Sequence, residues 1–173
     1  MTPIRVLVVD DQTLVRQGIR SLLDLTPEVD VVAEAGDGDE ALAILTEREV
    51  DVVLLDLRMP GLDGVDTLRA MAKRGIRVPA LVLTTFDDET QLLAALRAGA
   101  KGYMLKDVTL EQLVAGVRSV ASGGSLLQPA LTERLLRAVA ERDAVESDIS
   151  PLPLTARELD VLRLAAVGWS NRE

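Results

Sequence analysis

The sequence predicts an α/β protein built on a five-stranded, doubly wound parallel sheet. Short runs rich in β-branched residues alternate with longer amphipathic segments from the N-terminus to about residue 122. Five strand–helix units of similar length require crossover connections, which cover both faces of a parallel sheet with helices. The usual strand order of such a sheet is 2-1-3-4-5.

The hydrophobic patterns place the strands and helices along the chain. Strands are expected at residues 4–9, 29–34, 50–55, 79–84 and 102–105. The third run, VDVVLL, is apolar enough to be buried on both faces. The first helix shows apolar residues at steps of three and four: Leu14, Val15, Gly18, Ile19, Leu22 and Leu23. The last helix, 109–121, opens with a Thr-x-x-Gln capping box. Gly61 and Gly64, in the turn MPGLDG, are interpreted as positions that need backbone freedom.

The alternation of strand-like and helix-like segments ends after residue 122, and two loop-like segments follow. The chain is therefore predicted to have three parts. Residues 1–122 form the α/β domain, 123–153 a linker with one helix, and 154–173 a separate helical segment. The breaks SGGSLLQP and DAVESDISPLP flank the linker helix. In the last segment Thr155 and Glu158 form a capping box, and Gly168 stands where a C-cap belongs.

Composition excludes several classes of function. The chain has no cysteine and no histidine, so thiolate nucleophiles, Cys-based zinc sites and the commonest general base are absent. Carboxylate oxygens remain for metal binding and favour hard cations such as Mg²⁺. A net charge of −9 argues against a protein that binds nucleic acid over its whole surface. No apolar run reaches the length of a membrane span and the N-terminus lacks a signal-peptide pattern, so we expect a cytoplasmic protein with no membrane partner.

Polar residues follow the predicted strands at their carboxyl ends, where open parallel sheets bind ligands. These residues are Asp10 and Asp11 after the first strand, Asp56 after the third, Thr84 at the end of the fourth and Lys106 after the fifth. Strands one, three and four are neighbours in the expected order, so these side chains should converge in one crevice. Any one of them alone would be read as a loop residue or a helix cap, and only their combination favours a functional site.

Three carboxylates in one crevice repel one another unless a cation lies among them. A Mg²⁺ ion bound by Asp11 and Asp56, with Asp10 reaching it through water, would relieve this repulsion. The turn places the carbonyl of Arg58 to complete the metal sphere.

Asp56 would then act as a nucleophile toward a phosphoryl group and form an acyl phosphate. Thr84 would donate to a phosphoryl oxygen, and Lys106 would pair with its charge.

Four segments, VLVVDDQTLVRQGIRSLL, LLDLRMPGLDG, LVLTTF and GAKGYMLKD, resemble the receiver domain of bacterial two-component response regulators, which has a flavodoxin-like fold. The resemblance covers residues 3 to about 121. A further segment, LTARELDVLRLAAVGWSNRE, resembles the opening of a LuxR-type helix-turn-helix. Together they indicate the NarL/FixJ class of response regulators.

The resemblance implies roles for matching positions: Asp10 and Asp11 as the acidic pair, Asp56 as the phosphoacceptor, Thr84 as the switch hydroxyl and Lys106 as the family's lysine. Tyr103 matches the family's switch aromatic, although a half-buried strand residue has the same pattern. The resemblance further implies a transcription regulator rather than an enzyme, with at most slow autophosphorylation and autodephosphorylation. Its phosphoryl donor would be a separate sensor histidine kinase.

A homodimer on phosphorylation is also expected. The first and last helices of the α/β domain mix apolar residues with charged ones (Arg16, Arg20, Glu111 and Arg118), which suits a reversible interface. In this family, dimers are commonly built from those helices or from the face of the fourth helix and fifth strand.

The DNA-binding residues cannot be assigned, because the recognition helix of a LuxR-type domain would follow Glu173. Residues 154–173 carry three arginines and three acidic residues, which sum to zero charge. We therefore expect promoter DNA to be a partner only for a chain with the complete helix-turn-helix, and we interpret this chain as truncated.

Three rival hypotheses fit the sequence less well. The segment EAGDGDEAL matches a dinucleotide-binding fingerprint, but it follows the second strand and its acidic residues would repel a pyrophosphate. An aspartate-dependent phosphatase would carry a second aspartate two residues after Asp56, where this chain has Arg58. A receiver that only binds other proteins is the third, and the LTARE segment argues against it.

Overall fold

A computed structural model describes residues 2–85 and 89–127, together with 129, 131–133, 136, 137 and 140. Its strands are β1 (Ile4–Val9), β2 (Val29–Ala35), β3 (Val52–Asp56), β4 (Ala80–Thr84), β5 (Gly102–Leu105) and β6 (Leu126–Leu127). Its helices are α1 (Thr13–Leu23), α2 (Gly38–Glu47), α3 (Gly64–Lys73), α4 (Glu89–Ala98) and α5 (Leu110–Ala121). The strands form one parallel sheet in the order β2-β1-β3-β4-β5-β6. The α/β class and the order 2-1-3-4-5 are confirmed.

The predicted number of strands was too small by one. Leu126 and Leu127 pair with Gly102 and Tyr103 of β5, so the sheet continues into the range predicted to be linker. Two residues are too few to show the alternation of a strand, and the surrounding glycines and serines suggested a break. Beyond β6, the described residues between 129 and 140 are helical, and Leu131 is buried in the core.

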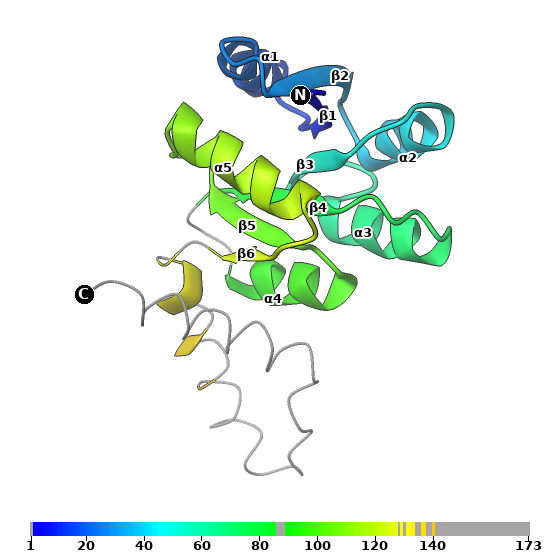
Figure 1. Cartoon of the computed structure of the whole chain (residues 1–173). Helices are drawn as coiled ribbons and strands as arrows, with labels where there is room; N and C mark the ends of the chain where they lie inside the picture. Colours follow the sequence, from blue (N-terminus) through cyan, green and yellow to red (C-terminus); the bar gives the residue numbers. More distant parts are fainter. Residues whose placement is uncertain are drawn as a thin grey trace, which may run out of the picture.

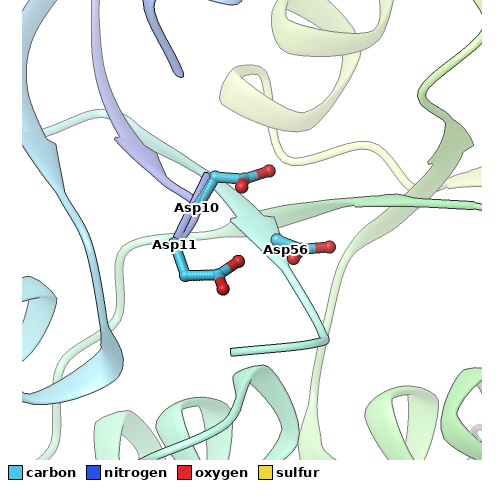
Figure 2. Close-up of side chains that lie close together, drawn as sticks. All are labelled: Asp10, Asp11 and Asp56. Carbon is cyan, nitrogen blue, oxygen red and sulfur yellow. The ribbon is translucent and has the colours of Figure 1, made fainter. Parts of the chain in front are cut away.

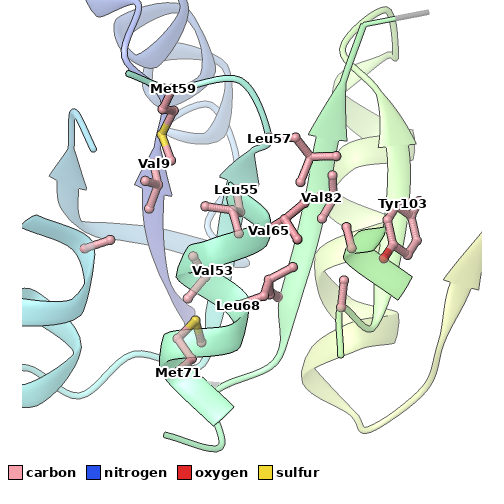
Figure 3. Packing of buried hydrophobic residues seen from close by; sticks show 14 of the residues in the cluster. Val9, Val53, Leu55, Leu57, Met59, Val65, Leu68, Met71, Val82 and Tyr103 are labelled. Carbon is pink, nitrogen blue, oxygen red and sulfur yellow. The ribbon is translucent and has the colours of Figure 1, made fainter. Parts of the chain in front are cut away.

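The helices cover the sheet in two layers (Figure 1). One core cluster lies between the sheet and the side of α2, α3 and α4, and the other between the sheet and the side of α1 and α5. Strand β3 contributes Val53 and Leu55 to the first cluster and Val52 and Leu54 to the second, because successive side chains of a strand point to opposite faces. The third strand is therefore buried on both faces, as predicted. Figure 3 shows the first cluster, with β3 packed against α3.

Polar side chains define the starts of three helices. Asp37 and Asp63 cap α2 and α3 by accepting hydrogen bonds from backbone amides three residues later, at 2.8 Å in each case. Thr109 and Gln112 form the predicted capping box of α5. Each such cap stabilises a helix by about 1 kcal/mol. The helices consequently begin just beyond the strand ends, where the polar residues gather.

The two glycines of the MPGLDG turn serve different purposes. Gly61 has a φ of 76°, a conformation that favours glycine, as expected for a turn. Gly64 is the first residue of α3, and a Cβ there would lie 2.7 Å from the Cα of Leu57 and against the carbonyl of Asp56. Gly64 is thus required for close packing against the end of β3. No helix among the described residues is long and apolar enough to cross a membrane.

Candidate functional site

Three carboxylates gather where β1 and β3 end side by side. Asp10 and Asp11 follow β1, and Asp56 is the last residue of β3. One carboxylate oxygen from each lies within 4.8 Å of the others, and Figure 2 shows the three side chains together. Asp10 and Asp56 are only 1% and 6% exposed, whereas Asp11 is exposed. The structure thus brings together the acidic residues that the sequence placed at the strand ends.

Lys106 supplies the positive charge of the cluster. Its ammonium nitrogen lies 2.6 Å from Asp10 Oδ2 and 3.2 Å from Asp56 Oδ1. Its backbone amide donates to the carbonyl of Thr84 at 2.8 Å, which fixes the end of β5 against β4. One ammonium against three carboxylates leaves the cluster with an excess of two negative charges when all are ionised. A divalent cation would balance that excess.

The surroundings shift the pKa values of Asp56 and Lys106. Burial raises the pKa of Asp56, and the charge of Asp10 adds to this, while Lys106 and the backbone of Arg58 act in the opposite direction. Burial by itself lowers the pKa of Lys106, but the hydrogen bond to Asp10 and the charges of Asp56 and Asp10 outweigh it, so that pKa is raised. Ionising Asp56 therefore costs free energy, and a nearby cation would reduce that cost.

Asp10 already has a partner for each carboxylate oxygen. Its Oδ1 accepts from the backbone amide of Gln12 at 2.8 Å, and its Oδ2 accepts from Lys106. Its own amide donates to the carbonyl of Ala35 at 3.1 Å and so extends the β1–β2 pairing by one residue. Asp10 is consequently held in place by the protein itself.

The other residues predicted for the site, Thr84, Arg58 and Tyr103, differ in their exposure to solvent. Thr84 ends β4, is 9% exposed, and donates through Oγ1 to the carbonyl of Thr85 at 3.1 Å. Arg58 is exposed, two residues beyond Asp56. Tyr103 is 1% exposed and belongs to the core cluster on the α4 side, which Figure 3 shows. The segment 154–173, predicted to be the opening of a helix-turn-helix, lies outside the described residues.

Sequence reasoning missed one residue at this site. Arg16 extends from α1 to the turn after β1, where its Nη1 donates to the carbonyl of Asp10 at 2.5 Å. The amphipathic pattern of the first helix predicts that Arg16 lies on a surface available for dimers. No sequence signal distinguishes it, because an arginine on the polar side of an amphipathic helix is ordinarily solvated.

The glycine-containing loop after β2 has structural explanations. Asp37 caps α2 through the amide of Glu40, and Glu40 accepts in turn from the amide of Gly36 at 2.7 Å. Gly38 lies where a Cβ would collide with Thr67 and would approach the carbonyl of Leu62 to 2.8 Å. These contacts explain the glycine at position 38 without a nucleotide, whereas a Cβ at Gly36 would meet no atom closer than 3.7 Å.

Comparison with known proteins identifies the family. Residues 6–118 match the response regulator receiver domain. The nitrate/nitrite response regulator NarP of Escherichia coli (strain K12) is 41% identical over 99% of this chain and 79% of that protein. The transcriptional regulatory protein LnrK of Bacillus subtilis (strain 168) is 39% identical over 98% of this chain and 80% of that protein. The crystal structure of the response regulator ChrA, from a heme-sensing two-component system, is also similar, with a TM-score of 0.68 and 37% sequence identity. The match covers 97% of this chain and 77% of the ChrA chain.

The chain belongs to the response regulator receiver family, and its relatives are regulators of the NarL/LuxR type. It is therefore the receiver of a two-component system that controls transcription. Proteins of this family are switches rather than classical enzymes.

Proposed function

We propose that Asp56 is the phosphoacceptor of this response regulator and that a sensor histidine kinase supplies the phosphoryl group. The observation that carries the proposal is the placement of Asp56: a buried carboxylate at a strand end, within 4.8 Å of two other carboxylates and 3.2 Å from an ammonium. Two buried carboxylates, Asp10 and Asp56, beside a third, exposed one destabilise a protein unless their charge is balanced. None of the 173 residues is a histidine, so the phosphohistidine that donates the phosphoryl group must lie outside this sequence.

Asp11 and Asp56 would hold a Mg²⁺ ion directly, with the carbonyl of Arg58 as a further ligand. The donor set fits, since it consists of carboxylate oxygens with an excess of negative charge. Asp10 would contact the ion through water, because both of its oxygens already accept hydrogen bonds from Gln12 and Lys106. When bound, the ion screens the charge of the cluster from an incoming phosphoryl group.

In the transfer step, an Asp56 oxygen attacks phosphorus while the bond from phosphorus to the donor's imidazole nitrogen breaks. The product is an acyl phosphate on Asp56 and a free histidine on the kinase. Lys106 neutralises charge on the phosphoryl oxygens, and Thr84 donates a hydrogen bond to one of them. Position 58 is arginine rather than a second aspartate, so hydrolysis of the acyl phosphate by the chain itself should be slow.

Thr84 and Tyr103 would convert phosphorylation into a conformational change. To reach a phosphoryl oxygen, the Thr84 hydroxyl must leave the carbonyl of Thr85 to which it now donates. Tyr103 lies on β5, which pairs with β4 through Val82 and Thr84, so a shift at the end of β4 acts on its surroundings. This two-state change would favour a homodimer, and a complete chain would then bind promoter DNA through its helix-turn-helix.

The test of phosphorylation uses Mg²⁺ and acetyl phosphate, with the intact mass as the measurement. One phosphoryl group should be added to the wild-type chain, should be labile to base, and should be absent with EDTA or in Asp56→Asn. The same modification in Asp56→Asn would overturn the assignment. Sedimentation with beryllium fluoride tests the dimer: a shift toward a dimer supports the switch, and a monomer at every level of occupancy contradicts it.

A further inference from the structure

Arg16, on α1, contacts both the turn that contains Asp10 and Asp11 and the side chain of Glu34 on β2. Its Nη1 donates to the Asp10 carbonyl at 2.5 Å, and its Nη2 lies 3.4 Å from the hydroxyl of Thr13. Its Nε is buried and lies 3.6 Å from Glu34 Oε2 on β2. The Arg16 side chain is only 16% exposed, although it belongs to a helix whose neighbouring arginine, Arg20, is 46% exposed.

The carbonyl of Asp10 and the amide of Asp11 belong to the same peptide plane. A hydrogen bond to that carbonyl therefore fixes the orientation of the peptide from which Asp11 departs. The Asp11 carboxylate needs such support, because it is exposed and no hydrogen bond or ion pair with another described residue holds it. Asp10, by contrast, is held through its own side chain by Gln12 and Lys106.

We infer that Arg16 is a positioning residue for the divalent cation site and acts on Asp11 through the Asp10 carbonyl. Glu34 of β2 holds the guanidinium in the orientation that reaches this carbonyl. The inference rests on the proposed metal site. Groups that orient metal ligands from outside the coordination sphere typically contribute about 10- to 100-fold to metal affinity.

The chain offers a matched control in Arg20. Arg20 Nη1 pairs with Glu34 Oε1 at 2.7 Å, so Arg20 and Arg16, which both lie on α1, share one acidic partner on β2. The hydrogen bonds of Arg20 do not include Asp10. Arg16→Met and Arg20→Met therefore each remove one positive charge and one ion pair with Glu34, but only the first removes the contact with the Asp10 peptide.

The experiment measures Mn²⁺ affinity of the unphosphorylated protein by electron paramagnetic resonance, with no phosphodonor present. Arg16→Met should bind Mn²⁺ about 10-fold more weakly than the wild type, and Arg20→Met should bind it as the wild type does. Arg16→Lys, which keeps one donor, should fall between them. In the metal-free proteins, the NMR amide shift of Asp11 should move in Arg16→Met and not in Arg20→Met. At saturating Mg²⁺, phosphorylation of Arg16→Met should recover, because Asp56 and Lys106 are intact.

Equal affinities for the wild type and Arg16→Met, or an equal loss in Arg20→Met, would overturn the inference. If Arg16→Met does not fold, Arg16→Lys against Arg20→Lys gives the same comparison with the charge retained: weaker binding in the first alone supports the inference, and equal binding overturns it. A wild-type chain that binds no divalent cation would instead overturn the proposed metal site.

Discussion

The ammonium of Lys106 lies 2.6 Å from Asp10 Oδ2, although the two residues are 96 positions apart in the sequence. This contact joins the end of β5 to the end of β1, across the intervening β3 and β4. The same ammonium also contacts Asp56. Lys106 therefore holds together a cluster whose carboxylates repel one another, and the stability of the metal-free protein should depend on it.

Replacing Lys106 by methionine should lower the free energy of unfolding of the metal-free protein by about 1–3 kcal/mol, because it leaves the buried Asp10 oxygen without its donor. Adding Mg²⁺ should recover part of the loss. Urea unfolding with and without Mg²⁺ measures both effects. Lys101→Met, at an exposed position beside β5, is the control and should change stability by less than about 0.5 kcal/mol. Equal losses in the two variants would contradict this account.

Asp56→Asn should stabilise the metal-free protein by about 0.5–2 kcal/mol, since it removes one buried charge from a repelling cluster. The wild type should gain thermal stability from added Mg²⁺, and the variant should gain less. Thermal unfolding in EDTA and in Mg²⁺ gives the comparison. Asp107→Asn, an exposed neighbour of Lys106, serves as the control. The idea fails if Asp56→Asn is less stable than the wild type in EDTA.

The ion pair between Arg5 and Asp51 should account for part of the stability that the protein loses at acidic pH. Arg5 donates to both oxygens of Asp51 at 2.8–3.0 Å, and this hydrogen bonding holds the pKa of Asp51 below its usual value of 3.8. A carboxyl with a lowered pKa contributes stability that is present above 3.8 and is lost as the pH falls through its folded-state pKa. Asp51→Asn should therefore be less stable than the wild type at neutral pH, and the difference should shrink below pH 3.8. Urea unfolding across pH 2–7 tests this, and a difference that grows on acidification would refute it.

Gly64→Ala should destabilise the protein by about 1–3 kcal/mol, because the new methyl group meets the backbone of Asp56 and Leu57, which cannot move aside as a side chain can. It should also slow phosphorylation, since the obstructed backbone carries Asp56. Gly18→Ala is the matched control within a helix. Nothing lies within 4 Å of a Cβ at Gly18, so alanine there should stabilise α1 by about 0.5–1 kcal/mol. Chemical unfolding measures the stability of both variants. A Gly64→Ala variant as stable as the wild type would contradict the prediction.

The sequence was sufficient for features that depend on local pattern. The apolar run of β3 predicted burial on both faces, and the Thr109 capping box predicted the start of α5. The meeting of Asp10, Asp11 and Asp56 could be predicted because carboxyl ends of parallel strands share one edge.

Three features that depend on particular side-chain or backbone contacts between distant segments could not be predicted. Strand β6 is recognisable only by its pairing with β5, since two residues carry no period. Gly64 is required by the backbone of the preceding strand rather than by its own φ angle. Arg16 was assigned to the surface, because its contacts with Asp10 and Glu34 arise only when α1 packs beside β1 and β2.

The central claim is that Asp56 alone carries the phosphoryl group, and trapping the acyl phosphate tests it most directly. Borohydride reduces an aspartyl phosphate to homoserine, and trypsin then separates residues 49–58, which contain Asp56, from residues 6–16, which contain Asp10 and Asp11. After treatment with acetyl phosphate and Mg²⁺, tandem mass spectrometry should find homoserine at position 56 and nowhere else. Homoserine at position 10 or 11, or at no position in a protein whose intact mass shows the phosphoryl group, would contradict the account.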